Sequence, residues 1–250
     1  MRSARPPATP LTSPDRPTLR ITQHCSLGSS VSPVLANLFM HYAFDAWMAR
    51  EHPTIPFERY CDDAVVHCVS ETQAHRVRAA IADRMQQVGL RLHPTKTRIV
   101  YCQDGDRRGT YENTSFTFLG YTFRARAARS KTGKKFTSFL PAISTDALKK
   151  ISGEVRRWRL HRRTPLTIGE IAKKINPIVR GWIQYYGAFY RSALCPLLGR
   201  INAYLMRWIR KKYKRLRSYT KAIAAWRRIT SQYPRLFAHW AWVHTPWQTG

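Results

Sequence analysis

Residues 57–66 read Phe-Glu-Arg-Tyr-Cys-Asp-Asp-Ala-Val-Val, two runs rich in β-branched and aromatic residues around a pair of aspartates. This composition predicts a β-hairpin with strands over 55–60 and 64–69 and with Asp62 and Asp63 at the turn. Two adjacent carboxylates repel each other unless a cation lies between them, and magnesium prefers such hard oxygen ligands. The pair therefore points to two-metal phosphoryl or nucleotidyl transfer. The alternative is a solvated turn, in which Asp is a common residue.

The segments around this hairpin read as helices and further strands. Ser32 is a candidate N-cap with Pro33 at the first helical position, and apolar residues at helical spacing run to a helix end near Pro53. The capping box Ser70–Gln73 opens a second helix, which Gly89 closes. Short strands are predicted over residues 90–92, 97–101 and 116–123. Helices and antiparallel hairpins therefore mix in this half, which is an α+β pattern.

The second half of the chain reads mainly as helix. A basic stretch over 126–144 is expected to be a linker, after which Thr145 is a candidate cap for one helix. The capping box Thr167–Glu170 opens another, which Pro177 is expected to break or kink. A third helix interleaves apolar with basic residues. We expect residues 145–250 to form an all-α bundle with one basic side.

The overall composition excludes several classes of protein. The 250 residues are 44% hydrophobic and 12% aromatic, enough for one large or two modest domains. No apolar run approaches the roughly 18 residues of a membrane-spanning helix, so we expect no membrane partner. Five cysteines without a C-x-x-C pair and nine histidines without metal-ligand spacing indicate neither a disulfide framework nor a zinc site.

The N-terminal segment has a different composition. Residues 1–27 carry five prolines and no apolar period, and we expect them to form a disordered leader. Their Arg- and Ser-containing, acid-poor composition is compatible with an organellar transit peptide, but they show neither an amphipathic stripe nor a secretory signal. We therefore favour a cytoplasmic, nucleic-acid-associated location over organellar import.

Positive charge is concentrated in the second half. Lys and Arg number 43 against 14 Asp and Glu, which leaves a net charge of +29. Residues 1–125 hold 15 basic and 11 acidic side chains, whereas residues 126–250 hold 28 and 3, and no acid follows Glu170. Such a surface predicts a polyanionic partner, of which nucleic acid is the commonest, and the alternative is a solvated basic face.

Five segments occur in a characteristic order. They are Gly-Ser-Ser-Val-Ser-Pro-Val-Leu-Ala-Asn-Leu-Phe at 28–39, the hairpin at 57–66, Leu-His-Pro-Thr-Lys-Thr at 92–97, Phe-Leu-Gly-Tyr at 118–121 and Ile-Asn-Pro-Ile-Val-Arg-Gly-Trp-Ile-Gln-Tyr-Tyr at 175–186. In order and spacing the first four resemble the later palm motifs of group II intron reverse transcriptases. The fifth resembles the maturase, or X, domain that forms the thumb in that family. The resemblance assigns 28–125 to a partial palm and 145–250 to the thumb/X domain.

The resemblance implies a chemistry for the paired carboxylates. Asp62 and Asp63 would be catalytic residues that bind Mg²⁺, and Tyr60 would lie near the incoming nucleotide. Members of the family copy RNA into DNA, so an RNA template, a DNA primer and deoxynucleotides would be the substrates. They also hold the intron RNA in its splicing-competent shape, which makes group II intron RNA the expected partner.

Further site residues follow from the same resemblance. Gly28 and Ser29 would line the primer or nucleotide path. Lys96 would neutralise or protonate the leaving pyrophosphate, with an ordinary turn lysine as the equal alternative. The segment 118–121 either grips the primer or contributes core aromatics. The bundle would contact RNA through its basic residues, namely Arg180, Arg207, Arg210, Lys211, Lys212, Lys214 and Arg215.

The chain also departs from the family pattern. Where the family has Gly-Thr-Pro-Gln-Gly before the Ser-Pro helix, residues 24–28 read His-Cys-Ser-Leu-Gly. The fingers, the early palm and the strand that supplies a further metal-binding Asp have no counterpart, since the one acid upstream of Gly28, Asp15, lies in Ser-Pro-Asp-Arg-Pro. We therefore expect weak ion binding by this chain alone, unless a second copy or a separately encoded N-terminal half completes the palm.

Two functions follow from these observations. The first is a group II intron reverse transcriptase/maturase of the RNA-directed DNA polymerase class, which binds intron RNA and assists splicing. The alternative is an RNA-binding splicing cofactor, or an inactive remnant, without polymerase activity. The aromatic residues Trp182 and Trp208 lie on the apolar stripe of the bundle, so we expect them to be core residues rather than stacking platforms.

Overall fold

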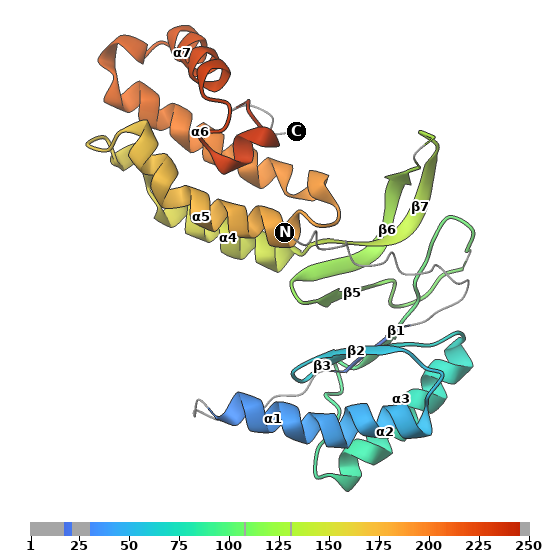
Figure 1. Ribbon diagram of the computed structural model, residues 1–250. Helices are drawn as coiled ribbons and strands as arrows, with labels where there is room; N and C mark the ends of the chain where they lie inside the picture. The colour runs from blue at the N-terminus through green and yellow to red at the C-terminus, as the bar shows by residue number, and fades with distance from the viewer. Residues whose placement is uncertain (1–17, 22–30, 108, 131, 246–250) are drawn as a thin grey trace, which may run out of the picture. The chain divides into compact units, whose positions relative to one another are not determined.

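The computed structural model describes residues 18–21, 31–107, 109–130 and 132–245 (Figure 1). The chain divides into two compact units, the first formed by residues 1–116 and 124–139 and the second by residues 117–123 and 140–250. Each unit is described by itself. Among the described helices, none combines the length and the apolar character needed to cross a membrane.

The first unit contains a four-stranded antiparallel sheet. Its strands lie in the order β2-β3-β1-β4, with β1 at Thr18–Ile21, β2 at Phe57–Tyr60, β3 at Asp63–His67 and β4 at Arg98–Val100. Helical segments follow β1 and β3 along the chain, so the unit has β-α-β-β-α-β connectivity. The four residues of β1 pair with β3 on one side and with β4 on the other. The expectation of a disordered leader is therefore wrong for these residues, because backbone pairing at the centre of a sheet orders them.

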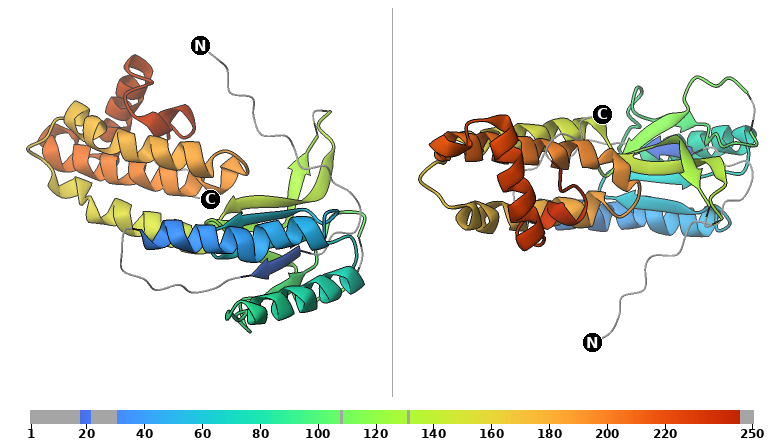
Figure 2. Two further views of the ribbon diagram at one scale, coloured as in Figure 1. Left: turned by 60° about the horizontal axis from the view of Figure 1, so that its bottom comes forward. Right: turned by 90° about the horizontal axis from the view of Figure 1, so that it is seen from above.

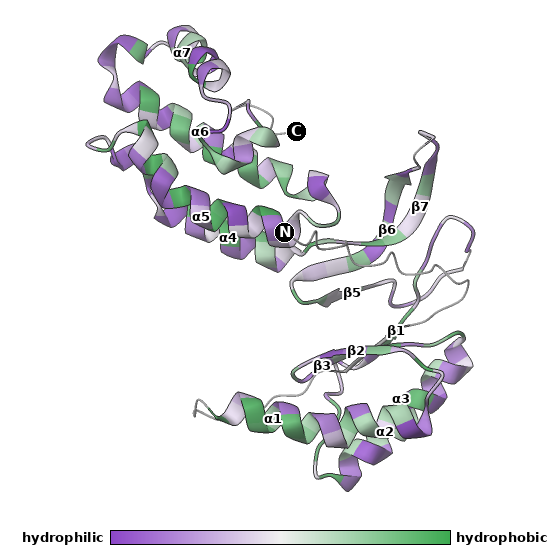
Figure 3. Ribbon diagram, viewed as in Figure 1, coloured by the Kyte–Doolittle hydropathy of each residue, from purple (hydrophilic) through white to green (hydrophobic). Residues whose placement is uncertain are grey.

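Two helical segments cover one face of this sheet. The first is a continuous run of α1 (Ser32–Met40), the π-helix η1 (His41–Asp45) and α2 (Ala46–Glu51), and the second is α3 (Glu71–Gln87) (Figures 1 and 2). Both pack on the strands through one apolar cluster, whose buried members are Met40, Phe44, Met48, Ile55, Ala64, Val66, Cys68, Ala74, Val77, Ile81 and Met85. The other side of α1 stays exposed although it is apolar, as Val34, Leu35, Leu38 and Phe39 show, and Tyr42 of η1 is exposed as well (Figure 3).

Local details of this unit differ from the sequence predictions. Val31 rather than Ser32 precedes the first helical turn, and Pro33 lies within that turn. The Ser70 hydroxyl accepts a hydrogen bond from the Gln73 backbone N–H, which confirms the cap. Residues 90–92 form no strand.

A three-stranded sheet follows, in the order β5-β6-β7. Its strands are β5 (Ser115–Phe118), β6 (Tyr121–Arg129) and β7 (Lys135–Ile143). The single strand predicted over 116–123 is in fact the end of β5 and the start of β6, joined by a turn at Leu119 and Gly120. The predicted linker over 126–144 is wrong as well, because most of it is the β6–β7 hairpin. Along β6 apolar residues alternate with arginines, but from Ala125 on the apolar positions are alanines, which are poor strand formers, so the pattern is weak.

The second unit is a helical bundle, as expected. Its longer helices are α4 (Thr145–Arg157), α5 (Ile168–Tyr186), α6 (Cys195–Lys212) and α7 (Tyr219–Gln232), and the short 3₁₀ turns are η2 (Leu160–Arg162), η3 (Arg191–Ala193), η4 (Lys214–Leu216) and η5 (Ala238–Ala241). The Thr167–Glu170 capping box forms in both directions. Helix α5 continues through Pro177, which does not break it. Pro177 and Lys173, whose carbonyl loses its amide partner, are both exposed, so water can satisfy that carbonyl.

The core of the bundle holds Trp208, which is fully buried, as expected from the apolar stripe. Trp182 is partly buried and stacks on Trp158, with ring centroids 5.5 Å apart and an interplanar angle of 7°. A polar cluster lies inside the same core, where the Asn202 side-chain oxygen accepts from His239 Nε2 at 2.6 Å and from Trp240 Nε1 at 3.0 Å. Burial lowers the pKa of His239 to about 3, so this imidazole is neutral at physiological pH.

Candidate functional site

The turn between β2 and β3 is tight and strained. Cys61 and Asp62 alone form the loop, and Tyr60 pairs directly with Asp63, so Asp63 is the first strand residue rather than a turn residue. Cys61 has a φ of 55°, in the left-handed region that a residue with a side chain rarely adopts. Such a conformation costs about 1–3 kcal/mol and is found most often at functional sites. Positive φ at the first of two loop residues is the pattern of a type II′ hairpin turn, where glycine is usual.

The strand pairing decides on which face of the sheet the carboxylates lie. Arg59 pairs with Ala64, which is buried beneath the helices, whereas Tyr60 and Asp63 pair one position further on. Because successive residues of a strand alternate between faces, Tyr60 and Asp63 project from the face opposite the helices. Tyr60 is 60% exposed, and Asp62 and Asp63 are partly exposed. Tyr60 and the Asp63 carboxylate therefore lie on the face of the hairpin opposite the helices, with Asp62 beside them in the turn.

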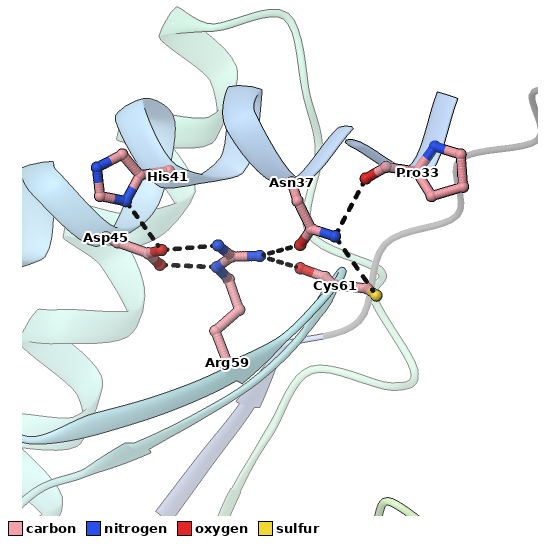
Figure 4. A network of polar contacts seen from close by, with 6 residues as sticks. All are labelled: Pro33, Asn37, His41, Asp45, Arg59 and Cys61. Atoms are coloured by element: carbon pink, nitrogen blue, oxygen red, sulfur yellow. Dashed lines mark hydrogen bonds and ion pairs between the residues drawn. The ribbon is translucent and has the colours of Figure 1, made fainter. Parts of the chain in front are cut away.

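A polar network holds this turn from the helical side (Figure 4). The Arg59 guanidinium donates from Nε and Nη2 to the two carboxylate oxygens of Asp45, each at 2.7 Å. Its Nη1 donates to the Cys61 backbone oxygen at 2.7 Å and to the Asn37 side-chain oxygen at 3.0 Å. Asn37 Nδ2 in turn donates to the Pro33 carbonyl at 3.1 Å and approaches the Cys61 sulfur at 3.9 Å. One arginine thus ties the turn to the α1–η1 helix.

Electrostatics reinforce this arrangement. The Arg59 side chain is 11% exposed and that of Asp45 is 23% exposed, so the pair is partly shielded from solvent. The hydrogen bonding to Asp45, which accepts from Arg59, raises the pKa of Arg59 further above its already high ordinary value, against the opposing effect of burial. His41 Nδ1 lies 3.5 Å from the second oxygen of Asp45. A fork-shaped guanidinium with several fixed donors satisfies this geometry, whereas the single ammonium of a lysine does not.

The described residues do not complete a metal centre. Within the described ranges no group of three or more His, Cys, Asp or Glu side chains is placed to hold an ion. The central strand β1 contributes only Thr18, Leu19, Arg20 and Ile21, and Ile21 lies opposite Ala64, the residue after Asp63. The strand neighbouring the carboxylates is thus present, but its described residues carry no acid. Two-metal centres need more oxygen ligands than Asp62 and Asp63 supply.

Of the other residues expected near the nucleotide, the structure describes only Lys96. Gly28 and Ser29 lie outside the described residues. Lys96 is partly buried in the turn before β4. Arg20 of β1 pairs with Arg98 on one side and with Val65 on the other, so β4 begins at the same end of the sheet as Asp63. Lys96 therefore precedes a strand end that lies two strands away from the carboxylates.

The Phe118–Tyr121 segment docks onto the end of α5 within the second unit. Leu119 and Gly120 have φ values of 49° and 76°, so both turn residues are left-handed, as in a type I′ turn. The Tyr121 hydroxyl donates to the Tyr185 carbonyl, and the Tyr185 hydroxyl donates to the Leu119 carbonyl at 2.8 Å. Burial raises the pKa of Tyr121 to about 12. Residues 118–121, the last of the four palm motifs, therefore contact the tyrosine pair Tyr185–Tyr186 at the end of the fifth segment.

The basic residues proposed for RNA contact differ in their surroundings. Arg180, Arg207, Lys211, Lys214 and Arg215 are exposed on α5, α6 and η4, and the guanidinium of Arg207 lies 5.4 Å from the Tyr204 ring centroid. Arg210 is exposed too, although its Nε donates to the Arg217 carbonyl at 2.9 Å.

Lys212 is engaged within the bundle. Its Nζ donates to the carbonyls of Thr164 at 2.9 Å and Leu166 at 2.6 Å, and it lies 5.4 Å from the Trp208 ring centroid. These contacts indicate a role for Lys212 in joining two segments of the bundle.

Three residues of the turn network could not be selected from the sequence. Arg59 precedes the Tyr-Cys-Asp-Asp segment directly, but Asn37 and Asp45 lie in a helix about 20 residues earlier with no motif of their own. The sequence offered one signal for Arg59. It is a charged residue at a strand position, and the residues two positions away, on the same face of the strand, are apolar. That signal indicates a buried partner without identifying it.

Comparison with known protein families agrees with this geometry. Residues 15–123 match the family "Reverse transcriptase (RNA-dependent DNA polymerase)", and residues 148–226 match "Group II intron, maturase-specific domain". The first match begins upstream of Gly28, within the segment expected to be unrelated to polymerases, and it includes β1. A search of curated proteins gives no match. A reverse-transcriptase region with its paired carboxylates, followed by the maturase-specific bundle, places this chain in the group II intron reverse transcriptase/maturase family.

Proposed function

We propose that this protein binds group II intron RNA through its helical bundle, assists splicing and uses the Asp62–Asp63 turn for RNA-directed DNA synthesis. The observation that carries the proposal is the strained two-residue turn, in which Asp62 and Asp63 follow Tyr60 at the tip of the hairpin. Template RNA, a DNA primer and deoxynucleotides are the proposed substrates. Reverse transcriptases use divalent metal ions, and we propose magnesium because carboxylate oxygens are the ligands on offer.

A second function is favoured by the composition of β1. Since the described part of that strand supplies no acid, the carboxylate pair lacks a further ligand among the described residues. A maturase-type splicing cofactor without polymerase activity needs only the bundle, whose core and basic surface do not depend on the carboxylates. For DNA synthesis a further ligand would have to come from outside the described residues, and we propose a second copy or a separately encoded N-terminal half as a source.

Primer extension on an RNA template, with magnesium and the purified full chain, separates the two functions. The first function predicts extension that Asp62→Ala abolishes while intron RNA binding stays within about threefold of the wild type. Asp106→Ala, at an aspartate of the loop before β5, is the matched control and should extend normally. If the wild type binds the intron RNA tightly and extends no primer, the polymerase part of the proposal fails and the splicing cofactor remains.

RNA binding through the basic residues has its own test. Replacing the exposed Lys211, Lys214 and Arg215 by Ala should weaken intron RNA binding and flatten the dependence of log K on log salt by about 0.7–0.9 for each phosphate interaction that the substitutions remove. Filter binding between about 50 and 200 mM salt measures this slope. Replacing Lys149, Lys150 and Arg157, three exposed basic residues of α4, by Ala removes the same number of positive charges and provides the control. An unchanged slope in the triple variant would contradict RNA contact by α6 and η4.

A further inference from the structure

The ion pair with Asp45 fixes the orientation of the Arg59 guanidinium independently of the turn. Two hydrogen bonds of 2.7 Å to the two oxygens of Asp45 fix both the position and the plane of the group. Because the guanidinium is rigid, the two N–H bonds of its third nitrogen, Nη1, have fixed directions. One leads to the Asn37 side-chain oxygen, which leaves one direction for the turn. That direction leads to the Cys61 carbonyl, 2.7 Å away, at the tip of the hairpin (Figure 4).

The bonded carbonyl belongs to the peptide that joins Cys61 to Asp62. Holding this oxygen fixes the plane of that peptide, and with it the direction in which Asp62 leaves the turn. Cys61 stands at a φ of 55°, a conformation that persists only where the surroundings impose it. The Tyr60–Asp63 pairing closes the two-residue loop. Two side-chain contacts then reach Cys61 from the helical side, the Arg59 bond to its carbonyl and the Asn37 approach to its sulfur.

The π-helix explains how one helix supplies both supports. In a regular α-helix, Asn37 and Asp45 would be offset by about 80° around the axis, because eight residues exceed two turns of 3.6 residues. The π-helical residues His41–Asp45 lie between them and take more residues per turn, which reduces this offset. Asn37, His41 and Asp45 therefore share one side of the helix, and Arg59 reaches both Asn37 and Asp45 at once.

We propose that Arg59 is a positioning residue that, anchored by Asp45 and supported by Asn37, holds the Cys61 carbonyl and thereby sets the presentation of Asp62 and Asp63. By strand alternation Asp63 and Arg59 point to opposite faces of the sheet, so Arg59 acts through the backbone of the turn and not on a substrate. The consequence for DNA synthesis rests on the proposed function, but the effect on the turn does not.

The direct test compares the wild type with Arg59→Lys, which keeps the charge and loses the fork. Backbone ¹⁵N relaxation of the full chain should give order parameters near 0.85 for residues 61–63 in the wild type and below about 0.6 in Arg59→Lys. The strand residues Ala64, Val65 and Val66 should keep their values, because ladder hydrogen bonds and the core hold them. A purely structural role would instead loosen β2 and β3 together.

Two further variants keep the test decisive. Arg50→Lys alters an arginine of the same unit that makes an exposed ion pair with Glu51, and it should leave all these values unchanged. Asn37→Ala removes the second support without touching the ion pair, and it should loosen residues 61–63 to a smaller extent. This variant carries the test if Arg59→Lys does not fold. Rigid residues 61–63 in both Arg59→Lys and Asn37→Ala, or loosening spread evenly over both strands, would overturn the proposal.

Primer extension adds a functional readout that is separable from the first. Where the wild type extends primers, Arg59→Lys should lower kcat at least tenfold and change the KM for deoxynucleotides less than threefold, because the carboxylates are misdirected and not removed. An unchanged kcat would contradict the positioning role. If the wild type extends nothing, the polymerase function fails while the relaxation data still decide whether Arg59 holds the turn.

Discussion

Single residues with unusual backbone conformations lie in two hairpin turns of this protein. Cys61 at the β2–β3 turn and Leu119 at the β5–β6 turn are left-handed although they carry side chains. At each turn the backbone oxygen of that residue accepts a hydrogen bond from a side chain outside the two-residue loop, Arg59 for Cys61 and Tyr185 for Leu119. The same physical device, a carbonyl held from outside, therefore stabilises two strained loops.

Gly120→Ala should destabilise the second unit by about 1–2 kcal/mol, because a left-handed residue with a Cβ carries a steric cost of that order. A Cβ at this position would also lie 3.0 Å from the Tyr186 hydroxyl oxygen. Urea denaturation followed by tryptophan fluorescence measures the change. The comparison variant is Leu119→Gly, which relieves strain but loosens the unfolded chain, and should change stability by less than about 1 kcal/mol. Equal losses in the two variants would show that backbone strain does not limit this turn.

At the scale of elements, the end of α6 combines stability with charge. Successive basic residues Arg210, Lys211 and Lys212 occupy its last turn, where positive charge favours the helix dipole. Lys212 turns back to the carbonyls of Thr164 and Leu166, in the loop before α5, while Lys211 is exposed. Neighbouring lysines on one helix therefore have different roles.

Lys212→Met should lower the unfolding free energy of the second unit by about 1–3 kcal/mol, the range for hydrogen bonds that involve a charged group. Methionine retains an apolar stem against Trp208, so the missing hydrogen bonds dominate the effect. Lys211→Met should leave stability within about 0.5 kcal/mol of the wild type and weaken RNA binding instead. Chemical denaturation and filter binding, applied to both variants, measure the two effects. If Lys212→Met weakened RNA binding and Lys211→Met lowered stability, Lys212 would belong to the RNA-binding surface.

For the whole molecule, the two units have separate hydrophobic cores, and the core of the second contains a buried histidine. His239 lies fully buried in the core of the second unit, and burial lowers its pKa to about 3. In the unfolded chain a histidine takes up its proton near pH 6.5. Between these values the unfolded state binds a proton that the folded unit excludes, so acid favours unfolding of the second unit.

The unfolding free energy of the second unit should fall by up to about 1.4 kcal/mol per pH unit below about pH 6 on account of His239. Seven of the eight tryptophans follow residue 150, so tryptophan fluorescence reports mainly on this unit. Urea titrations at pH 7, 6 and 5 measure the trend. His239→Gln keeps a donor for Asn202 and does not titrate, so its stability should depend less on pH. A parallel decline in wild type and variant would assign the acid sensitivity to other groups.

The sequence by itself determined which segments are helices, where the carboxylate hairpin lies and to which family the chain belongs. Those features depend on local patterns: the capping boxes at Ser70 and Thr167, the apolar stripe through Trp208, and the order of the motifs. Local patterns fail where the pairing partner is remote. The short strand β1 and the basic hairpin β6–β7 carry no distinctive alternation, and the sheet that orders β1 is assembled from β3 and β4, at least 42 residues further along the chain.

The tertiary structure alone decided how the turn is held. The bonds from Arg59 to Asp45 and Asn37 join residues 14 and 22 positions apart, and a π-helical segment brings the two partners to one side of the helix. The tertiary structure also gave Lys212 contacts that differ from those of its basic neighbours, and it brought Tyr121 into contact with the end of α5. Hydrogen-bond partners depend on distance and direction in space, which residue composition does not encode, and for that reason the carboxylates were found from the sequence and their supports were not.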